Sequence, residues 1–240
     1  MKLNKQILEL AFRDIDPIYS RDLLCLCSGG VDSISIAHFL KHNEYIARNY
    51  NLKIMHINHN YRPQNYEMAE SVRNFCLTFR MFILNVRLQH NKLRKKFTEA
   101  YLREKRNEIL DIYLSSYTNG NPKIVAVTAH HLDDCVESYL LNCIRGHQNY
   151  NPIPCITKFE KHIICRPFIL NKKSDFIEYC EKHDLMKYVV EDTTNSESVG
   201  SRRNMIRNEI IPLLNRDSVG MHKIVKKFVE KRISLDLIKN

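Results

Sequence analysis

Leu23-Leu24-Cys25-Leu26-Cys27-Ser28-Gly29-Gly30-Val31-Asp32-Ser33 is the stretch that decides the fold. It begins with five apolar residues, and an apolar run of this length bounded by turn residues is typical of a buried strand. Two adjacent glycines follow, and a segment of helical period comes directly after them. Strand, glycine turn and helix in this order predict a ligand site, because ligands of open α/β sheets bind beyond the carboxyl ends of strands.

Apolar runs and amphipathic segments alternate along the rest of the chain. The apolar runs lie at 52–57, 81–88, 123–129 and 162–168, and the segments of helical period at 32–50, 67–79, 99–117, 132–146 and 172–185. Such alternation is typical of parallel strands joined by helical crossovers. It predicts an α/β fold with a doubly wound, mainly parallel five-stranded sheet and a helical appendage at the C-terminal end.

The composition favours a polyanionic partner and argues against a membrane. The 240 residues carry a formal charge of +10, so the surface field attracts nucleic acid without proving that it binds. The first 16 residues include Glu9, Asp14 and Asp16 and do not resemble a signal or transit peptide. No apolar stretch approaches the roughly 18 residues of a spanning helix. We therefore expect a cytoplasmic protein without membrane association.

The eight cysteines do not follow a metal-binding pattern. No CxxC pair occurs, so neither a zinc nor an iron–sulfur site is expected. Cys25 and Cys27 lie two apart in the first predicted strand and would share one of its faces. We interpret them as small buried apolar residues.

The turn after the first strand has the chemistry of a phosphate site. Adjacent glycines let the backbone approach a ligand, and the N–H groups at the start of a helix suit phosphate oxygens. Ser28 and Ser33 add hydroxyl groups. The Asp32 carboxylate would repel bare phosphate, so we expect it to hold a Mg²⁺ ion that bridges the phosphates. The chain has no GxxxxGK[ST] motif and therefore no ordinary P-loop.

Ser28 to Ser33 (SGGVDS) resembles the PP-loop of the ATP pyrophosphatases, which split ATP between its α and β phosphates and adenylate a substrate. GMP synthetase, asparagine synthetase, NAD synthetase and several tRNA-thiolating enzymes carry similar loops. The loop therefore indicates the chemistry and not the substrate. The resemblance implies a PP-loop catalytic domain of the adenine nucleotide α-hydrolase type at 1–214 and a short basic helical tail at 215–240.

Two further segments resemble the tRNA(Ile)-lysidine synthetases. His56 to Arg62 (HINHNYR) is close to the family's HxNHGLR, with Asn60 in place of glycine. Asparagine tolerates positive φ, so the backbone shape of the turn can survive. Glu99 to Arg106 (EAYLREKR) is similar to EAxARxxRY. Its Arg103 and Arg106 lie three apart on one helical face and can hold phosphate.

The later motifs complete the resemblance in the expected order. Thr128 to Glu137 (TAHHLDDCVE) resembles AHHxDDxxET, and its Asp134 and Glu137 project from one face of a helix. Arg145-Gly146 follows where the family has RGxG. The segments 191–195 (EDTTN) and 201–212 (SRRNMIRNEIIP) closely resemble EDxSN…RNxIRxxxxP, and the second of them is the most discriminating match.

The resemblance covers Leu23 to Leu214 and implies a ligase that forms a C–N bond. The C2 oxygen of the wobble cytidine in a CAU anticodon attacks the α-phosphate of ATP, and the ε-amine of free L-lysine then displaces AMP to give lysidine. ATP, Mg²⁺, free lysine and the anticodon arm of a tRNA are the implied ligands.

The resemblance also distributes the roles among residues. The catalytic residues implied are Asp32, Asp134, Glu137 and Arg203, and the metal ligands are Asp32 and Asp134. The nucleotide-binding residues implied are Ser28, Gly29, Gly30, Val31, Asp32, Ser33, His56, Asn58 and His131. The substrate-binding residues implied are Arg103, Arg106, Asp134, Glu137, Arg145, Asn204 and Arg207.

Two alternatives stay open. A PP-loop tRNA thiolase also adenylates a base, but it usually needs a catalytic or cluster-binding set of cysteines. A catalytically inactive RNA-binding relative is the other. A basic surface that could hold the RNA includes Arg87, Lys92, Arg94, Lys95, Lys96, Lys226, Lys227, Lys231 and Arg232.

Overall fold

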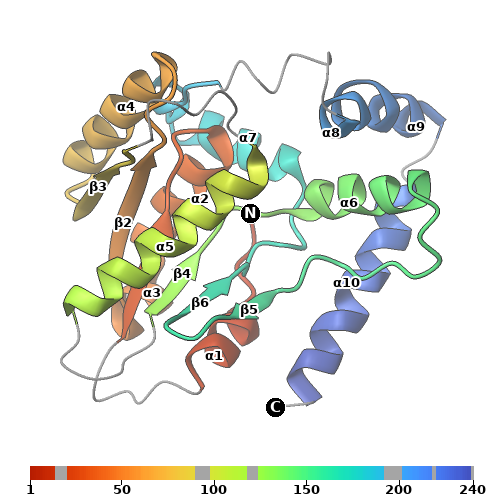
Figure 1. The fold of residues 1–240 in the computed structure, drawn as a ribbon, viewed down its shortest axis with the longest axis horizontal. Helices are drawn as coiled ribbons and strands as arrows, with labels where there is room; N and C mark the ends of the chain where they lie inside the picture. The colour runs from red at the N-terminus through yellow and green to blue at the C-terminus, as the bar shows by residue number, and fades with distance from the viewer. Residues whose placement is uncertain (14–20, 90–97, 118–123, 192–201, 218–219, 239–240) are drawn as a thin grey trace.

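The computed structural model describes residues 1–13, 21–89, 98–117, 124–191, 202–217 and 220–238. A sheet of order β3-β2-β1-β4-β6-β5 lies at its centre (Figure 1). The strands are β1 (Asp22–Leu26), β2 (Asn51–Asn58), β3 (Ile83–Arg87), β4 (Ile124–Val127), β5 (Ile156–Lys158) and β6 (His162–Cys165).

The predicted doubly wound, mainly parallel sheet is confirmed. Strands β3, β2, β1, β4 and β6 are parallel, and β5 adds a sixth, antiparallel strand at the edge. The three residues of β5 are too few to show a strand pattern in the sequence. Strand β1 pairs with β2 on one side and with β4 on the other. The chain order therefore reverses at β1, where sheets of this kind bind ligands.

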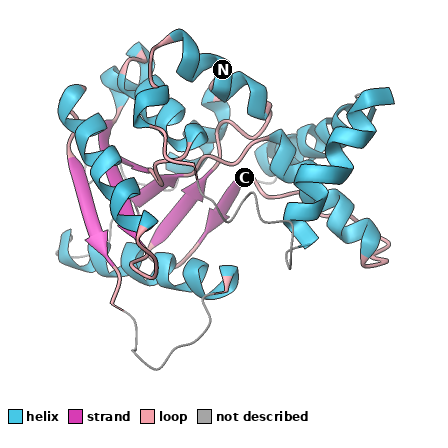
Figure 2. Cartoon of the chain, turned by 90° about the horizontal axis from the view of Figure 1, so that it is seen from above, coloured by secondary structure: helices cyan, strands magenta, loops and turns pink. Residues whose placement is uncertain are grey.

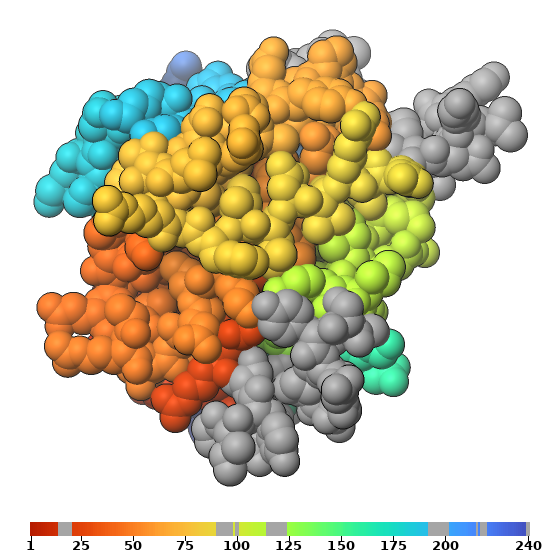
Figure 3. Space-filling model, turned by 90° about the vertical axis from the view of Figure 1, so that its left-hand side faces the viewer, coloured from red at the N-terminus to blue at the C-terminus, as the bar shows by residue number. Residues whose placement is uncertain are grey.

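Helices cover both faces of the sheet, as the view from above shows (Figure 2). The described helices are α1 (Lys5–Phe12), α2 (Val31–Lys41), α3 (Glu44–Asn49), α4 (Gln64–Thr78), α5 (Glu99–Tyr117), α6 (Leu132–Ile144), α7 (Lys173–Lys182), η1 (Met186–Tyr188), α8 (Arg202–Met205), η3 (Ile206–Ile210), α9 (Ile211–Asp217) and α10 (Gly220–Ile238). Figure 3 views the molecule from the edge formed by β3, where α4 packs beside that strand.

Alternate residues of the strands feed two apolar cores. Leu23 and Cys25 of β1 point into the larger core, whereas Leu24 between them points into a smaller core with Ile109 and Leu110 of α5. This period of two is the normal geometry of a strand. Among the described helices, α5 covers the smaller core.

Helix α10 is part of the larger core. Val225, Val229 and Ile233 are buried at helical spacing, and the helix packs against α6. Lys226, Lys227 and Lys231 are exposed, so the helix is amphipathic and basic, as the sequence predicts. In the described residues, no helix combines the length and the apolar character needed to cross a membrane.

Candidate active site

The loop after β1 is closed by one serine hydroxyl. Ser33 Oγ accepts hydrogen bonds from the backbone N–H groups of Ser28 (3.1 Å) and Gly29 (3.2 Å) and donates to the carbonyl of Gly30 (2.9 Å). Gly29 has a φ of +94°, and a Cβ on it would lie 3.4 Å from both Met68 O and Val72 Cγ2 of α4. Glycine is therefore required there for its conformation, and the tight packing adds to that requirement.

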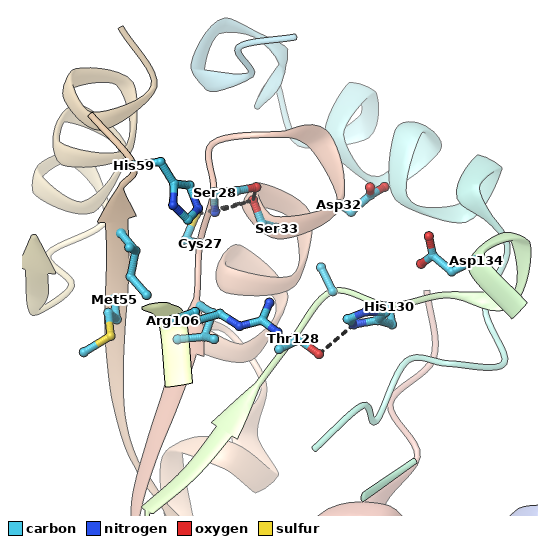
Figure 4. A pocket seen from close by; sticks show the side chains of 13 residues that line it. Cys27, Ser28, Asp32, Ser33, Met55, His59, Arg106, Thr128, His130 and Asp134 are labelled. Atoms are coloured by element: carbon cyan, nitrogen blue, oxygen red, sulfur yellow. Dashed lines mark hydrogen bonds between the residues drawn. The ribbon is translucent and has the colours of Figure 1, made fainter. Parts of the chain in front are cut away.

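A cavity of about 290 Å³ opens beside this loop (Figure 4). Its walls come from the ends of β1, β2 and β4, from the loop, and from α5 and α6. The lining residues are Leu26, Cys27, Ser28, Asp32, Ser33, Met55, Ile57, His59, Arg106, Thr128, Ala129, His130 and Asp134. The side chains of Asp32 and Asp134 lie on one side, and those of His59 and Arg106 on the other. The cavity thus presents carboxylates opposite a guanidinium.

Asp32 is held by a lysine that sequence reasoning missed. The ammonium of Lys173 lies 2.7 Å from each carboxylate oxygen of Asp32, and His131 Nε2 lies 3.6 Å away. Burial works against the charged carboxylate, but the contacts with His131 and Lys173 outweigh it and lower the pKa of Asp32. Lys173 is the first residue of α7, where a cation is unfavourable for the helix dipole. That unfavourable position is a sequence feature that could have indicated an acidic partner for Lys173 in another part of the chain.

His131 lies behind the cavity, among the acids. Its side chain is 6% exposed, with Nδ1 at 3.7 Å from Asp133 and 3.6 Å from Asp134. Burial favours the neutral ring, but Asp134, Asp32 and Asp133 together raise the pKa of His131. The backbone N–H of His131 also donates to Asp134 at 2.9 Å and so caps α6.

His56 and Asn58 support the floor of the site. His56 is buried, with Nδ1 at 2.8 Å from the carbonyl of Cys27, and burial lowers its pKa. Asn58 accepts the N–H of Asn60, whose φ of 49° confirms that asparagine preserves the turn. Neither they nor His131 is among the described residues that line the cavity. The nucleotide contacts expected of these three residues stay a prediction.

Glu137 is enclosed by arginines. Its side chain is 2% exposed, and Arg207 donates to its two oxygens at 2.5 and 2.9 Å. Arg203 Nε lies 3.6 Å away, and Arg207 also lies 3.9 Å from Asp134. Burial raises the pKa of Glu137 against the pull of Arg207. Arg207 lies in the π-helical segment η3, a feature frequent at functional sites.

The predicted basic residues are only partly brought together. Arg106 of α5 lines the cavity, and Arg103 lies exposed one turn before it. Arg145 caps the far end of α6, a helix of 13 residues, roughly 20 Å from its start. Asn204 lies in α8 beside Arg203. Several predicted residues fall outside the described part of the chain, namely 192–195, Ser201, Lys92, Arg94, Lys95 and Lys96.

Arg166, which the sequence did not single out, adds a buried cation near the basic side. It is 7% exposed and donates to Pro154 O at 2.8 Å and Thr157 Oγ1 at 2.9 Å. Burial and the nearby Arg106 lower the pKa of Arg166 to about 10. Burial also lowers the pKa of His130, to about 4, even though Asp134 pulls it upward. His130 is therefore a neutral ring in the cavity wall, at 2.9 Å from Thr128.

Comparison with known proteins agrees with this geometry. Residues 2–214 match the family model of the PP-loop domain. The tRNA(Ile)-lysidine synthase of Wigglesworthia glossinidia brevipalpis is 28% identical over 220 residues, 88% of this chain and 52% of the relative. That of Exiguobacterium sibiricum is 32% identical over 194 residues, 80% and 43% of the two chains. The chain thus spans about half the length of these relatives.

Solved structures show the same fold. The U34-tRNA thiolase NcsA of Methanococcus maripaludis, described with its [4Fe-4S] cluster, superposes with a TM-score of 0.65 at 14% identity, over 96% of this chain and 78% of the thiolase. NMN synthetase of Francisella tularensis gives 0.54 at 12% identity, over 98% and 91% of the two chains. At these identities the likeness concerns the fold alone.

Proposed function

The chain belongs to the family of PP-loop domains, and we propose that within this family it is an ATP-dependent ligase that forms lysidine at the wobble cytidine of a CAU-anticodon tRNA. The observation that carries the proposal is the similarity of most of the chain to tRNA(Ile)-lysidine synthases. Four of the motifs that resemble the family, at 28–33, 56–62, 99–106 and 128–137, also contribute residues to the lining of the cavity at the end of β1. The reaction class follows from the family, and the substrate follows from these relatives.

The nucleotide would lie with its phosphates over the loop 28–33. The first backbone N–H groups of α2 have no carbonyl a turn earlier in the helix and suit phosphate oxygens. The backbone N–H groups of Ser28 and Gly29 already donate to Ser33 Oγ. We therefore assign the pyrophosphate contacts mainly to the backbone of Val31 and Asp32 and to the exposed hydroxyl of Ser28.

Asp32 and Asp134 fit a Mg²⁺ site because both carboxylates line the cavity. In the described part of the chain, no group of three or more His, Cys, Asp or Glu side chains is arranged to hold a metal ion unaided. Mg²⁺ often takes one or two protein carboxylates and completes its shell with phosphate and water. When bound, Mg²⁺ would neutralise the phosphate oxygens of ATP. The Asp32 carboxylate would then bind the metal in place of the Lys173 ammonium.

Each half-reaction has a proposed set of residues. In the first, Arg106 and Lys173 stabilise phosphate charge while the C2 oxygen of cytidine attacks the α-phosphate and pyrophosphate leaves. In the second, Asp134 binds the ε-ammonium of lysine and accepts one of its protons. The neutral ε-amine then attacks C2, AMP leaves, and the new C–N nitrogen loses its second proton to water. We assign the lysine to Asp134 rather than Glu137, since Arg207 and Arg203 enclose Glu137. These two arginines hold Glu137 and the start of α6 in place.

A thiolase mechanism gains no support from the cysteines. Seven of the eight are buried, and burial raises the pKa of each of these seven thiols, which opposes thiolate formation. The eighth, Cys143, lies near the far end of α6 from Asp134. An inactive relative is disfavoured because Ser28, Asp32 and Asp134 all line the cavity.

Nucleoside mass spectrometry tests the proposal. The chain is incubated with tRNA(Ile) carrying a CAU anticodon, ATP, Mg²⁺ and lysine, and the tRNA is digested. We expect the wobble cytidine to be replaced by lysidine, and no product when lysine or ATP is omitted. A thiolated nucleoside in the presence of a sulfur donor would favour the thiolase. No product under either condition, with ATP still bound, would favour the inactive relative.

A further inference from the structure

A series of polar contacts connects the C-terminal helix to the PP-loop. His222 Nε2, in the first turn of α10, lies 3.1 Å from Oδ1 of Asp133. Oδ2 of Asp133 accepts the backbone N–H of Lys173 at 2.7 Å. The ammonium of Lys173 in turn lies 2.7 Å from both oxygens of Asp32. Four segments distant in the sequence therefore meet at the acidic side of the cavity.

The contact between His222 and Asp133 is sheltered from water. His222 is 5% exposed, and its Nδ1 atom is buried with no hydrogen-bond partner among the described residues. The ring therefore depends on Asp133. Burial disfavours the carboxylate, but the hydrogen bonds from His222 and from the Lys173 backbone lower the pKa of Asp133. Hydrogen bonds to a charged, partly buried carboxylate are among the stronger ones in proteins.

The rest of α10 holds His222 in place. Val225, Val229 and Ile233 continue its buried face, and the helix packs on α6, whose first turn carries Asp133. His222 lies outside the segment 2–214 that matches the PP-loop family. A residue beyond the matched domain thus contacts an acid next to the cavity.

We infer that His222 is a positioning residue of the nucleotide site: by holding Asp133 it fixes the first residue of α7 and so places the Lys173 ammonium beside Asp32. Lys173 then pairs with the Asp32 carboxylate in the absence of ligand and stands within reach of the phosphates. His222 acts through these residues and touches no reacting atom. The inference rests on the proposed binding of ATP and extends it to the C-terminal helix.

Two variants of His222 test the inference, and both replace the ring with a side-chain amide. Glutamine places its side-chain nitrogen close to the position of His Nε2, whereas asparagine is one methylene shorter. We expect His222→Asn to weaken the binding of ATP with Mg²⁺ about tenfold by calorimetry, as losing the partner of a ligand-holding group commonly does. His222→Gln should stay within about twofold of the original chain.

Val225→Ala provides the control for packing. It removes buried methyl groups one turn along the same face, so the melting temperature should fall while ATP affinity is unchanged. An equal loss of ATP affinity in Val225→Ala would overturn the inference, because α10 would then act through general packing. Equal affinities for His222→Asn and the original chain would overturn it as well.

Hydrogen exchange of the Lys173 amide gives a readout that needs no ATP. If Asp133 is released in His222→Asn, this amide loses its acceptor and should exchange faster, while His222→Gln preserves its protection. Unchanged protection in His222→Asn would contradict the inference even in a chain that binds ATP normally. Failure of the original chain to bind ATP would instead contradict the proposed function, so the two failures are distinguishable.

Discussion

The two acids that face the cavity stand on parts of the chain that are built differently. The loop that carries Asp32 is closed by Ser33, five residues from Ser28 in the sequence. The turn that carries Asp134 is held by partners 40, 70 and 89 positions along the chain, which bind Asp133 and Glu137. The shape of the loop that carries Asp32 is therefore determined by neighbouring residues. The charged groups around Asp134 depend instead on the packing of α7, η3 and α10.

Because of this difference, substitutions in the two regions should have different effects on activity and stability. A change in the loop should affect nucleotide chemistry while leaving the remaining fold intact. A change around Glu137 removes one partner of a buried ion pair, which destabilises the structure as well as the site.

The largest expected effect is that of Asp32→Ala on adenylation. Loss of the carboxylate that organises the metal should slow AMP formation by about a thousandfold, or roughly 4 kcal/mol in activation free energy. Asp32 and Lys173 are 26% and 40% exposed, so their ion pair should contribute no more than about 1 kcal/mol to stability. Quenched assays measure the rate of AMP formation, and thermal unfolding measures the change in stability. AMP formation at the normal rate would defeat the assignment of Asp32.

Glu137→Gln should mainly affect stability. The neutral amide leaves Arg207 and Arg203 without their carboxylate, and we expect a loss of about 3 kcal/mol in the free energy of unfolding. Arg207→Gln and the double variant complete a cycle that isolates the pair. In the folded fraction, both half-reactions should slow together. A selective loss of lysine transfer would show instead that Glu137 itself binds lysine.

Ser33→Ala and Ser28→Ala form a matched pair in the loop. Removing the Ser33 hydroxyl leaves two backbone N–H groups without their acceptor, which should cost about 1–3 kcal/mol in stability and weaken ATP binding. Ser28 is exposed, so its loss should change stability by no more than about 0.5 kcal/mol. Denaturant titration compares the two. Equal effects would mean that Ser33 does not close the loop.

The smallest expected effect is that of removing the RNA outside the anticodon arm on kcat/KM. Phosphate contacts supply affinity with little sequence information, whereas unstacked loop bases can be read in a pocket. We expect an isolated CAU stem-loop to be modified within about tenfold of the full tRNA in kcat/KM, roughly 1.4 kcal/mol. Exposed cations of α10 such as Lys227 and Lys231 should make both reactions salt-sensitive. A loss of several hundredfold would show that distant parts of the tRNA are read.

The sequence predicted the features that depend on neighbouring residues. The strand, glycine turn and helix at 23–41 and the positive φ of Asn60 follow from local composition. The parallel sheet follows from the alternation of apolar and amphipathic segments. Strand β5 was missed because its pairing with β6, and not its own pattern, makes it a strand.

The sequence could not predict which charged and polar residues lie beside one another. Lys173, Arg166 and His222 belong to no obvious motif, and only the fold brings them beside Asp32, Arg106 and Asp133. His56, Asn58 and His131 were expected to touch the nucleotide because they lie in motifs. In the structure, His56 bonds to the carbonyl of Cys27 and His131 lies beside Asp32 and Asp134, all of which line the cavity, while Asn58 accepts the N–H of Asn60 in its own turn. A motif therefore locates a site without distinguishing its lining from its supports.

A two-stage reaction tests the central claim most directly. The chain is first mixed with α-labelled ATP, Mg²⁺ and CAU-anticodon tRNA without lysine, and lysine is added after a delay. We predict that label from ATP accumulates on the tRNA in the first stage, and that lysine then releases it as AMP with one lysidine formed for each AMP. Label that never joins the tRNA, or AMP that forms at the same rate without tRNA, would contradict the proposed adenylation of the base.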